Sequence, residues 1–153
     1  MSEERHGSEV SSASEKPSGR FVVGFDGSEG SLGALEWAVR QAELTNCALE
    51  IVAAWEWPSG FGWSSIPDNY QPGHDAQDML TPILASLHSA HPRLTITSKV
   101  IEGHPASVLV EESRGAELLI VGCRGHGEFV GMLIGSTSEH CVANAACPVV
   151  VFR

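Results

Sequence analysis

Residues 20–55 read RFVVGFDGSEGSLGALEWAVRQAELTNCALEIVAAW. Residues 20–26 are β-branched and aromatic and run into Asp-Gly, which predicts a short strand that closes in a turn. Residues 29–45 repeat apolar side chains at helical spacing, and residues 49–55 form a second, nearly continuous apolar strand. This stretch therefore predicts one complete strand–helix–strand unit.

The same alternation continues to the end of the chain. We expect helices at 75–90, 105–113 and 136–146 and strands at 94–101, 117–121 and 148–152. Pro82 should kink the first of these helices or mark a late start. Alternating strands and helices predict a doubly wound α/β sheet of five parallel strands with four helices, in strand order 3-2-1-4-5. Ligands of such sheets bind beyond the carboxyl ends of the strands.

Composition narrows the function classes. The chain has 153 residues, 42% of them apolar and 18% charged, which suits one globular domain. Its 9 basic and 19 acidic residues give a net charge of −10, which argues against a nucleic-acid partner because phosphate binding needs a basic face. No apolar run is long enough to span a membrane. Residues 1–18 are rich in Ser and Glu and predict a disordered tail without a secretory signal, so residues 19–153 form the expected domain.

The cysteines and histidines show no metal-site or disulfide pattern. The four cysteines contain no CxxC pair, which predicts free, mostly buried thiols and a cytoplasmic location. His88 and His91 are three residues apart but lack a carboxylate partner at ligand spacing, so we expect no metal held by side chains.

A glycine-rich segment follows the fourth predicted strand. Residues 122–138 read GCRGHGEFVGMLIGSTS, so a loop that allows close backbone approach runs directly into a helix start. Main-chain amides at such a place bind phosphate without a basic protein surface. The segment is not a Walker A loop, because Glu128 stands where that motif has lysine, and its glycine spacing is not that of a Rossmann loop.

The spacing that does occur is G-x-x-G, nine residues, then G-[S/T], at Gly122, Gly125, Gly135 and Ser136. It resembles the nucleotide-binding loop of the universal stress protein family. The stretches VVGFDGSEGS (22–31), GHPASVLVEESRGAELLIVGCRGHG (103–127) and GSTSEHCVANAACPVVVF (135–152) are similar to the same family's strands and helices. The resemblance covers residues 20–153. Trp55 departs from it, because many members carry a smaller residue or histidine there beside the adenine.

The resemblance implies a cytoplasmic homodimer in stress response that binds an adenine nucleotide: ATP, with Mg²⁺, or else AMP or cyclic AMP. Asp26 would bind ribose. The implied nucleotide-binding residues are Gly24, Phe25, Asp26, Ala54, Val121, Gly122, Cys123, Arg124, Gly125, His126, Gly127, Gly135, Ser136, Thr137 and Ser138. The subunits would meet along the last strand, through Val149, Val150 and Val151. The residues form no arrangement of base and nucleophile, so we expect no enzyme, although slow ATP hydrolysis is compatible with the site.

Several of these residues have competing structural interpretations. Asp26 before Gly27 also predicts an Asx turn. Ser136 with Glu139 matches a capping box, in which the serine side chain caps the last helix. Arg124 is also compatible with a solvated loop side chain.

At the level of function, the alternative is a protein-interaction module of the same fold that binds no nucleotide. The aromatic-rich connection at residues 56–73 is compatible with a lid, a partner surface or a self-packed loop.

Overall fold

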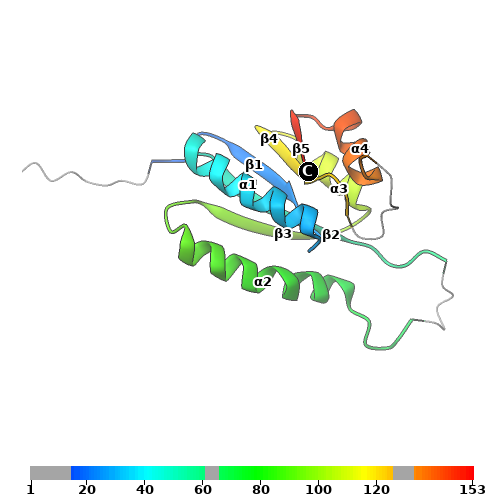
Figure 1. Cartoon of the computed structure of the whole chain (residues 1–153). Helices are drawn as coiled ribbons and strands as arrows, with labels where there is room; N and C mark the ends of the chain where they lie inside the picture. Colours follow the sequence, from blue (N-terminus) through cyan, green and yellow to red (C-terminus); the bar gives the residue numbers. More distant parts are fainter. Residues whose placement is uncertain (1–14, 61–65, 126–132) are drawn as a thin grey trace, which may run out of the picture.

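The computed structural model describes residues 15–60, 66–125 and 133–153 and has the predicted α/β architecture (Figure 1). The elements are β1 (Arg20–Gly24), α1 (Glu29–Thr45), β2 (Ala48–Trp55), α2 (Pro72–Ala90), β3 (Ile96–Glu102), α3 (Pro105–Glu112), β4 (Leu118–Gly122), α4 (Ser136–Asn144) and β5 (Val149–Phe152). All strand pairs are parallel, and the order is β3-β2-β1-β4-β5. Both the fold class and the strand order predicted from the sequence are confirmed.

Helices cover both faces of the sheet, which is why the central strands are apolar in nearly every position. One core contains the buried residues of α1 together with Leu80 of α2 and alternate residues of the strands. The other contains the remaining strand residues with Val108 and Leu109 of α3 and Cys141 of α4. In Figure 1, α3 and α4 pack against each other, well away from α2.

Helix α1 begins and ends where the sequence predicts. The Ser28 side chain accepts a hydrogen bond from the backbone of Ser31 and so caps the helix, and Asn46 ends it in the left-handed conformation. Helix α2 is the largest departure, because it begins at Pro72 rather than at residue 75 and continues through Pro82. Pro72 lies in the first turn, where a proline costs no hydrogen bond, so it is an efficient helix start.

The remaining boundaries shift by one or two residues. β1 ends at Gly24 instead of residue 26, because Asp26 already belongs to the turn that leads to α1. α4 ends at Asn144 instead of residue 146, and Ala145 is extended, three residues before Pro148, after which β5 begins at Val149.

At the amino-terminal end, Ser18 is already part of the packed structure. Its backbone N–H donates to the Asn46 carbonyl at 2.8 Å, although the sequence assigns this residue to the tail. Within the described ranges, no helix combines the length and the apolar character needed to cross a membrane.

Candidate functional site

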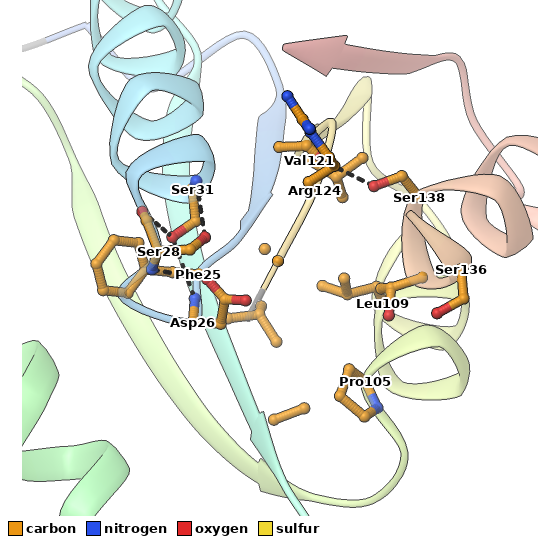
Figure 2. A pocket seen from close by; sticks show the side chains of 16 residues that line it. Phe25, Asp26, Ser28, Ser31, Pro105, Leu109, Val121, Arg124, Ser136 and Ser138 are labelled. Atoms are coloured by element: carbon orange, nitrogen blue, oxygen red, sulfur yellow. Dashed lines mark hydrogen bonds between the residues drawn. The ribbon is translucent and has the colours of Figure 1, made fainter. Parts of the chain in front are cut away.

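A cavity of about 310 Å³ lies at the carboxyl ends of β1, β2 and β4. β1 and β4 are neighbours in the sheet, and the chain leaves them toward opposite faces, so this is the switch point where parallel sheets bind ligands. Its size falls in the range of small-molecule pockets, roughly 300–1,000 Å³. The cavity is lined by Gly24, Phe25, Asp26, Ser28, Ser31, Val52, Ala54, Pro105, Leu109, Val121, Gly122, Arg124, Gly125, Ser136, Thr137 and Ser138 (Figure 2).

The turn between β1 and α1 presents Asp26 to the cavity. The Asp26 Oδ1 atom accepts a hydrogen bond from the Ser28 N–H at 2.9 Å, and Gly27 has φ +80°, so the predicted Asx turn is present. A Cβ atom at Gly125 would lie 2.7 Å from Asp26 Oδ2, which shows that the second carboxylate oxygen reaches the loop after β4. The structural interpretation of Asp26 is therefore confirmed, and it leaves a carboxylate on the cavity wall.

The first turn of α1 packs its backbone directly on the end of β4. A Cβ atom at Gly122 would lie 2.6 Å from the Gly30 carbonyl carbon, and one at Gly30 would lie 2.7 Å from the Arg124 carbonyl oxygen. Real Cβ atoms do not approach backbone this closely, so both positions require glycine for packing alone. Gly122 thus has a structural role that the motif did not reveal.

The start of α4 forms the opposite wall. Its N-cap is Gly135, with extended backbone, and no side chain caps the helix. The predicted capping box at Ser136 and Glu139 is therefore wrong: Ser136 is the first residue of the helix, and its side chain belongs to the cavity lining. In Figure 2, Asp26 and Ser136 stand on opposite sides of the view, with Leu109 between them.

The remaining lining is apolar and comes from two strands and α3. Val52 and Ala54 of β2, Val121 of β4 and Pro105 and Leu109 of α3 make up this part. The ring of Phe25 is buried in the core on the α1 face, with 4% exposure. The cavity therefore combines an apolar half with a polar half, as pockets for amphipathic small molecules do.

Trp55 does not shape this apolar half. A Cβ atom at Gly73 of α2 would lie 2.8 Å from the indole of Trp55, so the side chain packs under α2 rather than into the cavity. Trp57 meets Trp55 edge to face, with ring centroids 5.6 Å apart, and Tyr70 in turn contacts Trp57. Period-two alternation along β2 explains the separation, because Ala54 and Trp55 face opposite sides of the sheet.

The loop after β4 is described up to Gly125. Arg124 is exposed, and in Figure 2 its side chain extends away from Pro105 and the apolar half. Cys123 is buried and does not line the cavity; its thiol donates to the Leu133 carbonyl at 2.8 Å. His126 and Gly127, which the sequence also assigns to nucleotide binding, lie outside the described residues.

Sequence reasoning missed five lining residues: Ser28, Ser31, Val52, Pro105 and Leu109. For Ser28 a signal was present, because serine after Asp-Gly and before a helix is an N-cap pattern. Pro105 and Leu109 gave none, since only the tertiary structure places α3 over β2 and brings Leu109 to Gly24 at the end of β1.

The four cysteines are free, and three of them are buried, as predicted. Burial raises the pKa of the Cys141 thiol to about 11, so this thiol stays protonated at neutral pH. Among the described residues, no group of three His, Cys, Asp or Glu side chains is placed to hold a metal ion.

A family model described as the universal stress protein family matches residues 18–153. The chain belongs to the universal stress protein family. Universal stress protein Rv2623 of Mycobacterium tuberculosis is 36% identical to it over 138 residues, which are 86% of this chain and 44% of the relative. Rv2005c of the same organism is 32% identical over 139 residues, again 86% of this chain and 44% of the relative. The chain thus spans less than half the length of these curated family members.

Solved universal stress proteins share the fold. One in complex with cAMP is 27% identical, with a TM-score of 0.60, and the match covers 88% of this chain and 97% of that one. Another, from Arabidopsis thaliana with AMP bound, is 18% identical with a TM-score of 0.60 and covers 88% of this chain and 90% of that one, a likeness of fold alone.

Proposed function

We propose that this universal stress protein binds an adenine nucleotide in the cavity at the carboxyl ends of β1, β2 and β4. The observation that carries the proposal is the pairing, in one cavity, of an apolar half with a helix start that has no side-chain cap. The first amides of a helix have no partner within it, and the helix dipole favours negative charge there. The family member that was solved with cAMP supports the same ligand class.

The arrangement of the lining suggests an orientation for the ligand. The phosphate would lie at the start of α4, against the Ser136 and Thr137 backbone and hydroxyls. The ribose would lie against the Asp26 carboxylate, because a hydroxyl can donate to it whereas a phosphate would be repelled. The adenine would occupy the apolar half between Ala54 and Leu109.

We propose ATP with Mg²⁺ as the ligand, with AMP and cyclic AMP as alternatives. Arg124 is the one cation among the described lining residues, so a triphosphate would retain uncompensated charge without a divalent ion. The hydroxyls of Ser136 and Thr137 at the phosphate end of the cavity offer oxygen donors that suit Mg²⁺, and the ion would supply charge neutralisation at the phosphates.

The role would be that of a nucleotide-dependent switch in cytoplasmic stress response rather than of a dedicated enzyme. Asp26 is the one carboxylate among the described lining residues, and its Oδ1 atom already accepts from Ser28. A paired acid and base is therefore not offered by this part of the site.

A homodimer would form along β5, which is an edge strand of the sheet. Val149, Val150 and Val151 are half-buried within the chain, and an apolar edge strand is normally covered or paired.

The alternative function is a protein-interaction module that binds no nucleotide. Thermal unfolding with adenosine, AMP, cyclic AMP, ATP–Mg²⁺ and GMP separates the two. A ligand at a hundredfold excess over its Kd stabilises the folded state by about 2.7 kcal/mol, which shifts Tm by several degrees. A shift with adenine nucleotides and not with GMP supports the proposal, whereas a Tm that ignores all five ligands supports the interaction module.

Variants that test the site should leave Gly30 and Gly122 unchanged, because both are required for packing. Gly122→Val would place side-chain atoms against the backbone of α1, so loss of binding in that variant would not distinguish site from fold. Ser136→Ala and Thr137→Ala are sharper probes, because both residues line the cavity and neither side chain caps the helix.

A further inference from the structure

The start of α4 is fastened to the end of β4 by three hydrogen bonds. Ser138 Oγ donates to the Gly122 carbonyl at 2.5 Å, the Gly135 N–H donates to the Cys123 carbonyl at 2.6 Å, and Cys123 Sγ donates to the Leu133 carbonyl at 2.8 Å. We call this set the α4 tether. Two of its three bonds use side chains.

The Ser138 hydroxyl is committed to the tether. Ser138 lines the cavity but is only 4% exposed, and a hydroxyl has one proton to donate. Because the Ser138 hydroxyl donates its proton to the hydrogen bond with the Gly122 carbonyl, its oxygen could present only lone pairs to an anion in the cavity. Figure 2 shows the Ser138 side chain turned toward the end of β4, whereas Ser136 is not joined to any of the residues drawn. Side-chain donation to a phosphate therefore falls to Ser136 and Thr137.

Cys123 acts from outside the cavity. Its N–H donates to the Phe152 carbonyl at 2.7 Å, its carbonyl accepts from Gly135, and its thiol reaches Leu133. One residue thus joins the end of β5, the N-cap of α4 and the segment just before that cap. Loss of the thiol would release Leu133 while leaving both backbone bonds possible.

We propose that Cys123 and Ser138 are positioning residues for the phosphate half of the cavity and not phosphate ligands. The inference rests on the proposed function and deepens it. The tether fixes the position of the first amides of α4 relative to Asp26 and Leu109 on the other walls. Those amides bind the phosphate only if they converge on one point, so a loosened tether weakens phosphate binding and leaves the binding of the sugar and base intact.

The test compares AMP with adenosine on the full chain by calorimetry. In Cys123→Ala and in Ser138→Ala we expect AMP affinity to fall about fivefold each, the effect of one hydrogen bond, while adenosine affinity stays unchanged. Cys123→Ser restores AMP affinity, because a hydroxyl can donate to Leu133 in place of the thiol. Matched controls are Cys147→Ala, which removes a half-buried thiol elsewhere, and Thr81→Ala, which removes an exposed side-chain bond to Gln77 in α2.

A ligand-free measurement accompanies it, namely hydrogen exchange of the Gly135 and Glu139 amides, which donate to the Cys123 and Gly135 carbonyls. Faster exchange in Cys123→Ala and Ser138→Ala, and not in the two controls, supports the tether.

The outcomes separate this inference from the proposed function. If wild type binds none of adenosine, AMP, cyclic AMP and ATP–Mg²⁺, the proposed function fails, and the exchange measurement alone decides whether the tether holds α4. If wild type binds ATP–Mg²⁺ but not AMP, ATP–Mg²⁺ replaces AMP in the comparison. If wild type binds AMP but Cys123→Ala binds it equally well, the positioning role is overturned. A loss of AMP affinity in Ser138→Ala alone, without faster exchange, would instead make Ser138 a direct phosphate ligand. Equal losses for AMP and adenosine would mean that the whole cavity is disturbed and would also overturn the proposal.

Discussion

At the scale of single residues, Asp26 shows how a structural and a binding role share one side chain. Its Oδ1 atom accepts from Ser28 and closes the turn, and its Oδ2 atom lies close to Gly125 in the loop after β4. The Asx turn and the ribose contact were competing interpretations of the sequence. The geometry makes them compatible, because the two oxygens point to different neighbours.

Asp26→Asn separates the two roles. Asparagine keeps an oxygen that accepts from Ser28, so the Tm of the ligand-free protein should stay near that of wild type, whereas Asp26→Ala should lose about 1 kcal/mol of stability with the turn bond. Loss of the negative charge should weaken adenosine binding about tenfold, since hydrogen bonds to charged groups are the stronger ones. Calorimetric titration measures this difference. Asp26→Asn protein that binds adenosine like wild type would remove the ribose role.

A second ligand serves as the control for Asp26. If the carboxylate binds a ribose hydroxyl, Asp26→Asn should matter less for 2′-deoxyadenosine than for adenosine, because one of the sugar hydroxyls is missing. The same loss for both ligands would point to the remaining hydroxyl or to a change in the turn.

At the scale of elements, the contact between the start of α1 and the end of β4 sets the width of the site. Gly30 and Gly122 meet backbone to backbone, so the two walls that carry Asp26 and Arg124 stand closer than side chains would allow. We expect Gly30→Ala and Gly122→Ala each to lower stability by about 1–3 kcal/mol through overpacking. The double variant should cost less than the sum, because one displacement of α1 relieves both clashes. Denaturant unfolding tests this, and strictly additive costs would contradict a shared contact.

The amino end of the sheet carries an ion cluster formed by Arg20, Glu50, Lys99 and Glu112. Arg20 Nη1 lies 2.7 Å from Glu50, and Lys99 Nζ lies 3.3 Å from Glu50 and 2.7 Å from Glu112. The hydrogen bond to Glu112 raises the pKa of Lys99 above its usual 10.5, and the hydrogen bond from Lys99 lowers the pKa of Glu112 below its usual 4.5. The cluster ties three strands to the end of α3.

These two pKa shifts predict that the stability of the fold is constant at intermediate pH and falls at both acid and alkaline pH. The contribution of Glu112 is present above pH 4.5 and is lost as the pH falls through its lowered pKa. The contribution of Lys99 is present below pH 10.5 and is lost as the pH rises through its raised pKa. Lys99→Met should therefore flatten both limbs of a plot of Tm against pH.

The control for the ion cluster is Arg114→Met. It breaks an exposed pair with Glu111, both side chains being more than two-thirds exposed, and such pairs contribute little. If both variants change the acid limb equally, the effect reflects net charge and not the cluster.

At the scale of the whole molecule, β5 is the edge strand along which a second subunit would pair. Pro148 accepts a hydrogen bond from Leu119 of β4, and Phe152 accepts one from Cys123 just after β4. Alternation therefore directs the N–H groups of Val149 and Val151 to the outer edge of the sheet. Val151→Pro removes an outer donor and keeps the bonds to β4, as prolines in edge strands do. If a homodimer forms along β5, this variant should sediment as a monomer at concentrations where wild type sediments as a dimer. A wild-type monomer, or a dimer that Val151→Pro leaves intact, would rule out this interface.

The fold could be predicted from the sequence because its strands are apolar and its helices are amphipathic. The bounds of α1, residues 29–45, were predicted correctly because its cap, its periodicity and its left-handed end are all local signals. α2 was misjudged at its start because Pro72 looked like part of the preceding loop. At the candidate site, the turn at Asp26 and the lining role of Ser136 were readable, whereas the capping interpretation of Ser136 failed. Whether a side chain points to its own backbone or into a cavity depends on what lies opposite.

The sequence alone determined the alternation of strands and helices, the parallel sheet and the glycine spacing of the family, because these depend on residues close together along the chain. Only the tertiary structure decided which residues meet: Leu109 against Gly24 of β1, Gly30 against Gly122, and Cys123 and Ser138 holding α4 in place. The physical reason is that such contacts join segments far apart in the sequence, and their geometry exists only once the crossover helices have packed on the sheet.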